Sequence, residues 1–280
     1  MTGTLYLCAT PIGNLEDITF RVIRTLKEVD LIAAEDTRHS IKLLNHFDIK
    51  TPMTSYHEFN KRDKGPYLIE KLLEGTNIAL VTDAGTPGIS DPGEDLVKLA
   101  YEAGVPVTSL PGAAACITAL TLSGLSTRRF SFEAFLPTDK KEKQQILHEL
   151  SQETRTIILY EAPHRLVKTL KELRDALGNR KMTLVREITK KHETALKSTI
   201  SDVISYYEDV EVKGECVLVI EGRNREDMVK EEQDKWTNMS IPEHMEIYLR
   251  QGMDKKEAMK AVAVDRGVSK REVYNELLKQ

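Results

Sequence analysis

The chain has 280 residues, of which 40% are hydrophobic, and a formal net charge of −4. Its length suits two or three domains, and it shows neither an apolar run of about eighteen residues nor an apolar leader after Met1, so we expect no membrane-spanning helix and no secretory signal. Its three cysteines lie far apart without a Cys-x-x-Cys pair, so we expect small core residues in a reducing compartment rather than a disulfide framework or a metal site.

Apolar runs and amphipathic segments alternate along the first part of the chain. The predicted elements are a strand at residues 5–9, a helix at 17–27, a strand at 31–34, a helix at 41–47, a helix at 67–73, a strand at 78–82, a helix at 94–102 and a strand at 105–110. This alternation predicts an α/β domain with a mostly parallel sheet and helices on its faces.

A second alternating set follows a helix that is predicted to end at about Ser123. Its strands are expected at residues 130–135, 156–160, 182–185 and 216–220. We therefore predict two α/β domains, residues 1–120 and 121–222. The charged residues 223–237, which have no apolar period, are predicted to form a solvated linker or an exposed helix.

Residues 238–280 have the pattern of a small helical module. Ser240, Asp254 and Ser269 are predicted to cap three helices, and Gly267 to turn the chain between the last two. The spacing of small and apolar residues around Gly267 is typical of a helix-turn-helix. Such a module fits nucleic-acid contact as well as a purely packing or dimerising role, and both interpretations stay open.

The segment Asp83-Ala-Gly-Thr-Pro-Gly-Ile-Ser-Asp-Pro-Gly93 directly follows an apolar strand and holds three glycines and two prolines. This density prescribes one backbone shape. We expect Asp91 to be the N-cap of the next helix, Pro92 its first residue and Glu94 the partner in a capping box. Ligands of open α/β sheets bind at such strand-to-helix turns, although a tight connection without a ligand is the alternative.

Two further glycine-proline strand ends, Ala9-Thr-Pro-Ile-Gly-Asn14 and Ser109-Leu-Pro-Gly-Ala113, are expected to converge on the same crevice. Neither a G-x-G-x-x-G dinucleotide motif nor a P-loop is present, so the sequence does not indicate a pyrophosphate ligand. It favours a small ligand held by main-chain groups and the carboxylate of Asp83.

Polar clusters end three predicted strands, namely Glu35-Asp-Thr-Arg38, Glu161-Ala-Pro-His-Arg165 and Arg186-Glu-Ile-Thr-Lys-Lys-His-Glu193. One such cluster is often only a helix cap or a surface pair, but three together indicate a site. Residues 126–193 hold fifteen Lys and Arg against ten Asp and Glu. This local excess suits a polyanionic substrate, although ordinary solvated helix faces explain part of it.

Together with Tyr160 before the second cluster and Lys213-Gly-Glu215, these motifs resemble the tetrapyrrole methylase superfamily, and more closely the ribosomal RNA small subunit methyltransferase I family. The resemblance spans the chain, including its helix-turn-helix tail. It implies two α/β domains of the tetrapyrrole-methylase type with S-adenosyl-L-methionine in the interdomain cleft. It also implies 2′-O-methylation of a cytidine in the decoding region of 16S rRNA, in the small ribosomal subunit.

The resemblance also assigns residues. Those expected to line or close the cofactor pocket are Pro11, Asp83, Ala84, Gly85, Gly88, Ala113, Ala114 and Tyr160. Lys190 is the first candidate base, because a buried lysine with cationic neighbours can accept a proton. Arg186 and Arg165 are expected to stabilise charge or to bind phosphate. The acidic candidates, which orient these cations or share the base role, are Glu35, Glu161, Glu187 and Glu193, and His164 and His192 are weaker candidates.

Two rival functions remain compatible with the sequence. One is methylation of a small molecule such as a corrinoid precursor, and the other is a nucleic-acid-binding regulator that only senses S-adenosylmethionine. The first predicts a wide apolar cleft and gives no reason for the basic stretch or the tail. The second predicts cofactor binding without turnover and specific DNA affinity of the tail. The resemblance further implies a cytoplasmic homodimer without membrane contact.

Overall fold

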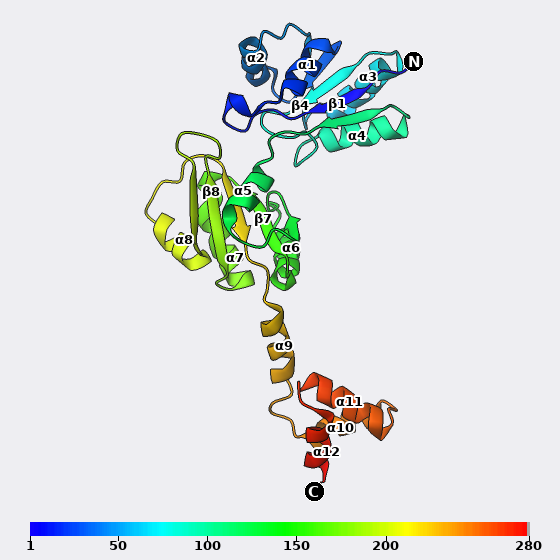
Figure 1. Cartoon of the computed structure of the whole chain (residues 1–280), viewed down its shortest axis with the longest axis vertical. Helices are drawn as coiled ribbons and strands as arrows, with labels where there is room; N and C mark the ends of the chain where they lie inside the picture. Colours follow the sequence, from blue (N-terminus) through cyan, green and yellow to red (C-terminus); the bar gives the residue numbers. More distant parts are fainter. Residues whose placement is uncertain (279–280) are drawn as a thin grey trace. The chain divides into compact units, whose positions relative to one another are not determined.

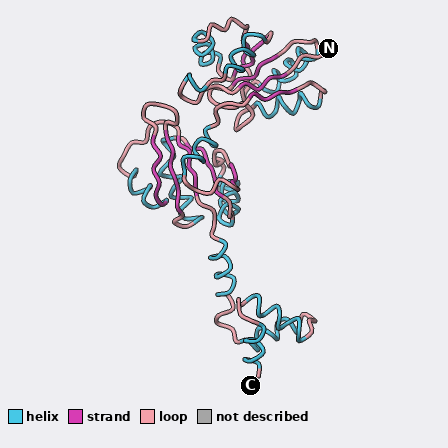
Figure 2. The backbone as a smooth tube through the Cα atoms, in the orientation of Figure 1, coloured by secondary structure: helices cyan, strands magenta, loops and turns pink. Residues whose placement is uncertain are grey.

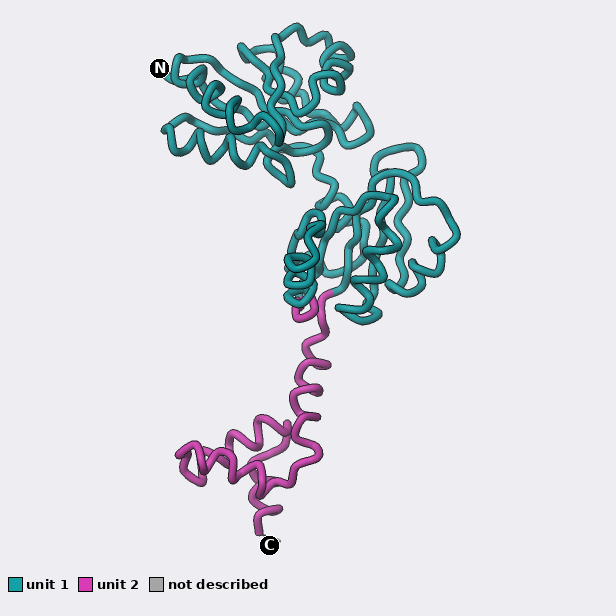
Figure 3. The backbone as a smooth tube through the Cα atoms, turned by 180° about the vertical axis from the view of Figure 1, so that it is seen from behind, with its two compact units in different colours: residues 1–150, 155–221 teal, residues 151–154, 222–280 magenta. Residues whose placement is uncertain are grey.

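The computed structural model describes residues 1–278 and divides into two compact units (Figure 3). The larger unit comprises residues 1–150 and 155–221, and the smaller one comprises residues 151–154 and the segment from Gly222 onward. The strands gather in two five-stranded sheets, both within the larger unit (Figure 2). No helix among residues 1–278 is long and apolar enough to cross a membrane.

The first sheet is wholly parallel, as the sequence predicts for this half. Its strands are β1 (Leu5–Cys8), β2 (Leu31–Ala34), β3 (Met53–Ser55), β4 (Ile78–Val81) and β5 (Val107–Leu110), in the order β3-β2-β4-β1-β5. Helices α1 (Phe20–Glu28) and α2 (Thr37–His46) cover one face, and α3 (Lys61–Leu73) and α4 (Gly93–Glu102) cover the other (Figure 1).

Side-chain alternation explains why both faces are covered. In β4, Ile78 and Leu80 enter the core beneath α3 and α4, whereas Ala79 and Val81 enter the core beneath α1 and α2. All four are buried. Because this strand is buried on both faces, its sequence is a continuous apolar run and not an alternation of apolar and polar residues.

The second sheet is mixed, so the parallel pattern of the first sheet does not extend to it. Its strands are β6 (Phe130–Phe132), β7 (Thr156–Glu161), β8 (Lys181–Arg186), β9 (Thr194–Thr199) and β10 (Cys216–Ile220), in the order β6-β7-β10-β8-β9. Only β6 and β7 pair in parallel, and the other neighbours are antiparallel. As a result, the start of β10 lies beside the ends of β7 and β8.

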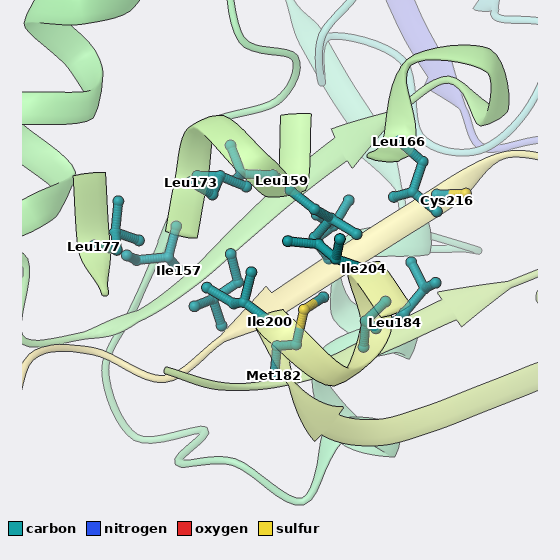
Figure 4. Close-up of a cluster of buried hydrophobic side chains, with 14 of the residues drawn as sticks. Ile157, Leu159, Leu166, Leu173, Leu177, Met182, Leu184, Ile200, Ile204 and Cys216 are labelled. Carbon is teal, nitrogen blue, oxygen red and sulfur yellow. The ribbon is translucent and has the colours of Figure 1, made fainter. Parts of the chain in front are cut away.

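Helices cover both faces of this sheet as well. Helix α5 (Ala115–Ser123) packs on one face, and α6 (Lys140–Gln152), α7 (Leu166–Leu177) and α8 (Ile200–Tyr207) pack on the other, around a core that Figure 4 shows. The boundary predicted at residue 120 falls inside α5. Because α5 packs against the second sheet, we propose that the second α/β domain begins just before this helix.

Local boundaries differ from expectation where the signals are weak. The helix predicted at residues 17–27 is divided into a short 3-10 turn, η1 (Leu15–Asp17), and α1, with Thr19 capping α1 through Val22 N–H. Strands β3 and β9 were not predicted. Each of the three cysteines lies in a hydrophobic core, as expected.

The smaller unit contains α9 (Arg225–Asp234), α10 (Ile241–Arg250), α11 (Lys255–Asp265) and α12 (Lys270–Leu277). Helix α9 has no buried residue, in agreement with a solvated segment. Ser240, Asp254 and Ser269 each form a capping box, so all three predicted helix starts are confirmed. A small core of Met245, Ala258, Val262, Ala263 and Val273 holds the last three helices together.

Candidate functional site

A cavity of about 310 Å³ lies where the strand ends of both sheets meet within the larger unit. The first sheet contributes residues that follow β1, β2, β4 and β5. The second sheet contributes residues that follow β6 and β8, the last residues of β7 and the start of β10. The lining residues are Ile12, Glu35, Thr82, Asp83, Ala84, Gly85, Thr86, Ile89, Ser90, Asp91, Ala114, Ala115, Phe135, Tyr160, Glu161, Glu187, Ile188, Lys190, Glu215, Cys216 and Val217.

The glycine-rich loop after β4 forms much of this wall and is tied to the loop after β1. Thr10 and Gly85 exchange main-chain hydrogen bonds of 2.9 and 3.1 Å, and the Thr10 hydroxyl donates to Thr82 O at 3.1 Å. Gly85 has φ +90°, and a Cβ placed there would lie 3.3 Å from Ile12 Cγ2. The backbone shape thus requires glycine, as the sequence indicated.

Asp91 has a different role from the predicted helix cap. Its carboxylate accepts hydrogen bonds from the main-chain N–H groups of Gly88, Ile89 and Gly93, at 2.8 to 3.0 Å. Helix α4 begins at Gly93 after Pro92, without a side-chain cap and without a capping box at Glu94. One carboxylate therefore closes the loop upon itself and holds it against the start of α4.

Two carboxylates, Glu35 and Asp83, lie side by side on the wall. Asp83 N–H donates to Glu35 Oε2 at 3.4 Å, and Asp83 Oδ1 accepts from Asp36 N–H at 3.1 Å. Burial raises the pKa of Glu35; the N–H group of Asp83 lowers it, and the negative charges of Asp83 and Asp91 raise it further. The fold thus increases the proton affinity of Glu35.

Tyr160 joins the second sheet to helix α5. Its hydroxyl oxygen accepts the N–H of Cys116, in the first turn of the helix, at 3.1 Å. Its ring packs edge-on against Phe132 and Phe135, with centroids 5.0 and 5.6 Å apart. Burial is the largest cause that raises the pKa of Tyr160, so the phenol is a neutral anchor of the helix start at ordinary pH.

Glu161, which is only 1% exposed, is the most buried acid on the wall. Its two oxygens accept from Thr169 Oγ1 at 2.5 Å and from Ala162 N–H at 2.8 Å, and Arg165 Nε lies 3.5 Å away. These partners satisfy a buried carboxylate that would otherwise be costly. Arg165 itself does not line the cavity and acts through Glu161.

The loop after β8 places Glu187 and Lys190 on the wall. Glu187 has φ +52°, and its Oε1 accepts from Lys190 Nζ at 2.9 Å. The loop is braced by Glu193, whose carboxylate accepts Thr189 N–H at 2.6 Å. Lys190 is 42% exposed and its ion-pair partner is an anion, whereas the predicted base role assumed a buried lysine with cationic neighbours.

Two glycines approach this loop closely. A Cβ on Gly13 would lie 2.6 Å from Lys190 Cγ, and a Cβ on Gly214 would lie 2.0 Å from Glu187 Oε1. Arg186 holds the second of these segments, because its Nη1 donates to Lys213 O at 3.0 Å. The side chain of Arg186 also lies over the Tyr207 ring and does not line the cavity.

The cavity brings most of the predicted residues together. Asp83, Ala84, Gly85, Ala114 and Tyr160 line it from the cofactor set, and Glu35, Glu161, Glu187 and Lys190 line it from the catalytic set. The predicted residues that do not line it, although each adjoins a lining loop, are Pro11, Gly88, Ala113, Arg165, Arg186 and Glu193.

Sequence reasoning assigned no role to several lining residues. Glu215 belongs to the Lys213-Gly-Glu motif, but only the antiparallel pairing of β10 with β7 and β8 brings it to the site. Thr82 ended the predicted strand and Thr86 was part of the recognised loop, and the Thr86 hydroxyl donates to Ala113 O at 2.9 Å. Ile12 lies in the recognised Ala9-Thr-Pro-Ile-Gly-Asn14 segment, whereas Phe135 had no distinguishing local signal.

The wall is strongly acidic. Its carboxylates are Glu35, Asp83, Asp91, Glu161, Glu187 and Glu215, and Lys190 is the one cationic side chain among the lining residues. Such a wall favours a ligand that carries positive charge and disfavours phosphate groups inside the cavity.

Comparison with known proteins gives consistent matches. The family model of tetrapyrrole (corrin/porphyrin) methylases matches residues 4–204. The chain is 51% identical to a ribosomal RNA small subunit methyltransferase I from Halalkalibacterium halodurans over 273 residues, which cover 98% of this chain and 94% of that protein. It is also 51% identical to the protein of the same name from Bacillus subtilis, with 98% and 93% covered.

Solved structures show the same fold at low identity. A uroporphyrin-III C-methyltransferase from Thermus thermophilus, complexed with S-adenyl homocysteine, superimposes with a TM-score of 0.57 and 20% identity, over 78% of this chain and 97% of that one. A diphthine synthase superimposes with a TM-score of 0.61 and 15% identity, over 78% and 90%. At these identities the similarity concerns the fold alone.

Proposed function

Because the chain belongs to the ribosomal RNA small subunit methyltransferase I family of tetrapyrrole methylases, we propose that it methylates small-subunit ribosomal RNA. The methyl donor is S-adenosyl-L-methionine, and the acceptor is the ribose 2′-oxygen of a cytidine in the decoding region of 16S rRNA. The observation that carries the proposal is the acidic cavity with the Glu187–Lys190 pair on its wall. We place the enzyme in the cytoplasm as a homodimer.

The residues present fit S-adenosylmethionine. A volume of about 310 Å³ is that of a small-molecule site, and the positive φ of Gly85 lets a ligand approach the main chain closely. The acidic wall suits a cationic sulfonium and ammonium. Asp83, Ala84, Gly85, Ala114 and Tyr160 would line the bound cofactor, which supplies an already activated methyl group.

The chain then has to position the acceptor oxygen and remove its proton. Positioning contributes several kcal/mol in such reactions. The Glu187 carboxylate is suited to accept the hydroxyl proton, and the Lys190 ammonium, 2.9 Å from it, to stabilise the negative charge that develops on the oxygen. Glu35, which follows a strand of the first sheet, is a second proton acceptor on the wall, and Glu161 orients Arg165.

Arg165, Arg186 and Glu193 act as positioning residues in this proposal. Arg165 fixes Glu161, Arg186 fixes the segment at Lys213, and Glu193 fixes the turn that presents Lys190. Pro11, Gly88 and Ala113 shape the loops that line the cofactor.

The test is methyl transfer from labelled S-adenosylmethionine to small ribosomal subunits and to bare 16S rRNA, followed by mass spectrometry of the nucleosides. We expect 2′-O-methylcytidine at one site, with the preferred substrate form shown by the rates. Cofactor binding without transfer to either RNA would instead support a small-molecule methylase or a sensor, and would overturn the proposed function.

A further inference from the structure

Two phenylalanine side chains stand almost completely in solvent on loops that follow strands of the first sheet. Phe59, between β3 and α3, is 97% exposed, and Phe20, at the start of α1, is 94% exposed. Both follow the carboxyl ends of parallel strands, the edge at which the cavity lies. A fully exposed apolar ring contributes nothing to folding, and both rings follow strands at the edge where the cavity lies, so both are available to a ligand there.

The loop that carries Phe59 is held in one shape. Asn60 accepts the N–H of His57 at 2.9 Å and donates to Ser55 O and Oγ at 3.3 and 3.2 Å. The preceding Tyr56 is buried and its hydroxyl donates to Pro92 O at 3.1 Å. The exposed ring is therefore presented by a braced turn.

Phe20 is presented in a similar way. Thr19 accepts Val22 N–H at 3.1 Å and so fixes the first turn of α1, and Asn14 caps the short turn before it by accepting Glu16 N–H at 3.1 Å. Ile12, on the same loop, lines the cavity. The backbone at Phe20 is thus fixed at both ends.

The loop that carries Phe59 begins beside Glu35 of the cavity wall. Ser55, the last residue of β3, pairs with Ala34, and Tyr56 N–H donates to Ala34 O at 2.8 Å. The His57 ring lies edge-on to the Phe59 ring, with centroids 6.2 Å apart. Phe59 therefore stands on a loop that adjoins the wall at Glu35.

Unpaired cations accompany both rings. Arg21 follows Phe20 directly and Arg62 lies one turn beyond Phe59, and both are exposed and form no ion pair with any residue in the described part of the chain. Lys61, in contrast, is neutralised by two carboxylates. The acidic cavity disfavours phosphate, so contacts to an RNA backbone must lie outside it, where these arginines stand.

We propose that Phe20 and Phe59 are stacking platforms for unpaired RNA bases that flank the methylated nucleotide, with Arg21 and Arg62 contacting the adjoining phosphates. Aromatic rings beside cations are the usual means of binding single-stranded RNA. A second copy of this chain fits less well, because each ring is isolated between polar neighbours and a stable dimer needs a broad apolar face. The inference rests on the proposed function for the identity of the RNA.

The test measures binding of a fluorescently labelled single-stranded fragment of the 16S rRNA decoding region, together with methyl-transfer kinetics on the preferred rRNA substrate. We expect Phe59→Ala and Phe20→Ala each to weaken RNA binding and to raise the KM for RNA about tenfold. The KM for S-adenosylmethionine and kcat should stay unchanged. Phe59→Trp should bind RNA as tightly as the unsubstituted protein, whereas Phe59→Leu should bind it as weakly as Phe59→Ala.

Tyr101→Ala is the matched control, because Tyr101 is an exposed aromatic residue, 67% accessible, at the end of α4 that lies away from the cavity. It should leave RNA binding unchanged. Equal RNA affinity of Phe59→Leu and the unsubstituted protein, or a change of oligomeric state in sedimentation with RNA binding intact, overturns the proposal. Loss of RNA binding in the alanine variants while the unsubstituted enzyme methylates no RNA supports stacking and rejects only the proposed reaction.

Discussion

Gly214→Ala offers a selective test of the arrangement at Glu187. Gly214 has φ +76°, and an added Cβ would lie 2.0 Å from Glu187 Oε1 and 2.5 Å from Cδ. The left-handed backbone costs an alanine about 1–2 kcal/mol. The overlap is relieved when the Glu187 carboxylate, the end of a flexible side chain, moves away from the added Cβ, so it adds little to that cost. The same movement disturbs the 2.9 Å hydrogen bond from Lys190 Nζ to this carboxylate.

The variant should therefore lose activity out of proportion to stability. A displacement of about 1 Å of a reacting group lowers the rate by about a hundredfold. We expect kcat to fall to that extent in the methyl-transfer assay, whereas thermal unfolding shows a loss of only about 1–2 kcal/mol. The KM for S-adenosylmethionine should change little, because Gly214 does not line the cavity.

Gly104→Ala is the control for backbone strain. Gly104 has φ +69° in the same unit, and nothing lies within 4 Å of a Cβ placed there. This variant should lose similar stability and keep its kcat. If Gly214→Ala retained the unsubstituted kcat, or if both variants lost activity equally, the position assigned to Glu187 in catalysis would be refuted.

Lys190→Ala should lower kcat about a hundredfold without unfolding the protein, whereas Lys191→Ala, at an exposed neighbour that does not line this cavity, should leave kcat unchanged. Burial raises the pKa of Glu35 above its unfolded value, so this group stabilises the fold while protonated and loses that contribution as pH rises through the folded pKa. Glu35→Gln should accordingly raise the melting temperature at neutral pH, with a gain that vanishes below about pH 4. Burial, and then a neighbouring arginine, lowers the pKa of His244, so its stabilising contribution exists above the unfolded value of about 6.5 and is lost as pH falls. Trp236, the chain's one tryptophan, stacks on His244 with ring centroids 3.7 Å apart, so its fluorescence should report acid unfolding of the smaller unit. His244→Phe should suppress this unfolding. A pH-independent signal in the unsubstituted protein would contradict the reasoning.

Local signals in the sequence were sufficient for features that depend on local chemistry. The capping boxes at Ser240, Asp254 and Ser269 involve residues three apart, so the helices of the smaller unit were predicted from a few letters each. The loop after β4 was located by its glycines and prolines, because few backbones accept that composition. The prediction that Asp91 is a helix N-cap was wrong, because its carboxylate accepts hydrogen bonds from N–H groups that precede it in the loop.

Features that depend on pairing between distant segments were not predictable in the same way. Strand β9 has no buried residue, so its sequence carries no apolar alternation, and only its six-residue register with β8 defines it. The position of Glu215 at the cavity follows from the antiparallel placement of β10, which no local pattern specifies. The surroundings of Lys190 likewise depend on a carboxylate three residues earlier and a turn conformation that composition does not disclose.

That turn belongs to a wider property of the site, the concentration of strained backbone around it. The non-glycine residues with positive φ among residues 1–278 are Asp48, Ser90, Ala134, Glu187 and Thr189. Ser90 and Glu187 line the cavity. Ala134 directly precedes the lining residue Phe135, and Thr189 stands between the lining residues Ile188 and Lys190. A positive φ costs an ordinary side chain energy, so it persists only where surrounding contacts impose it, here the bond from Thr189 N–H to Glu193. The wall is thus held in its shape before any ligand arrives, as expected of a site that accelerates a reaction chiefly by positioning two reactants.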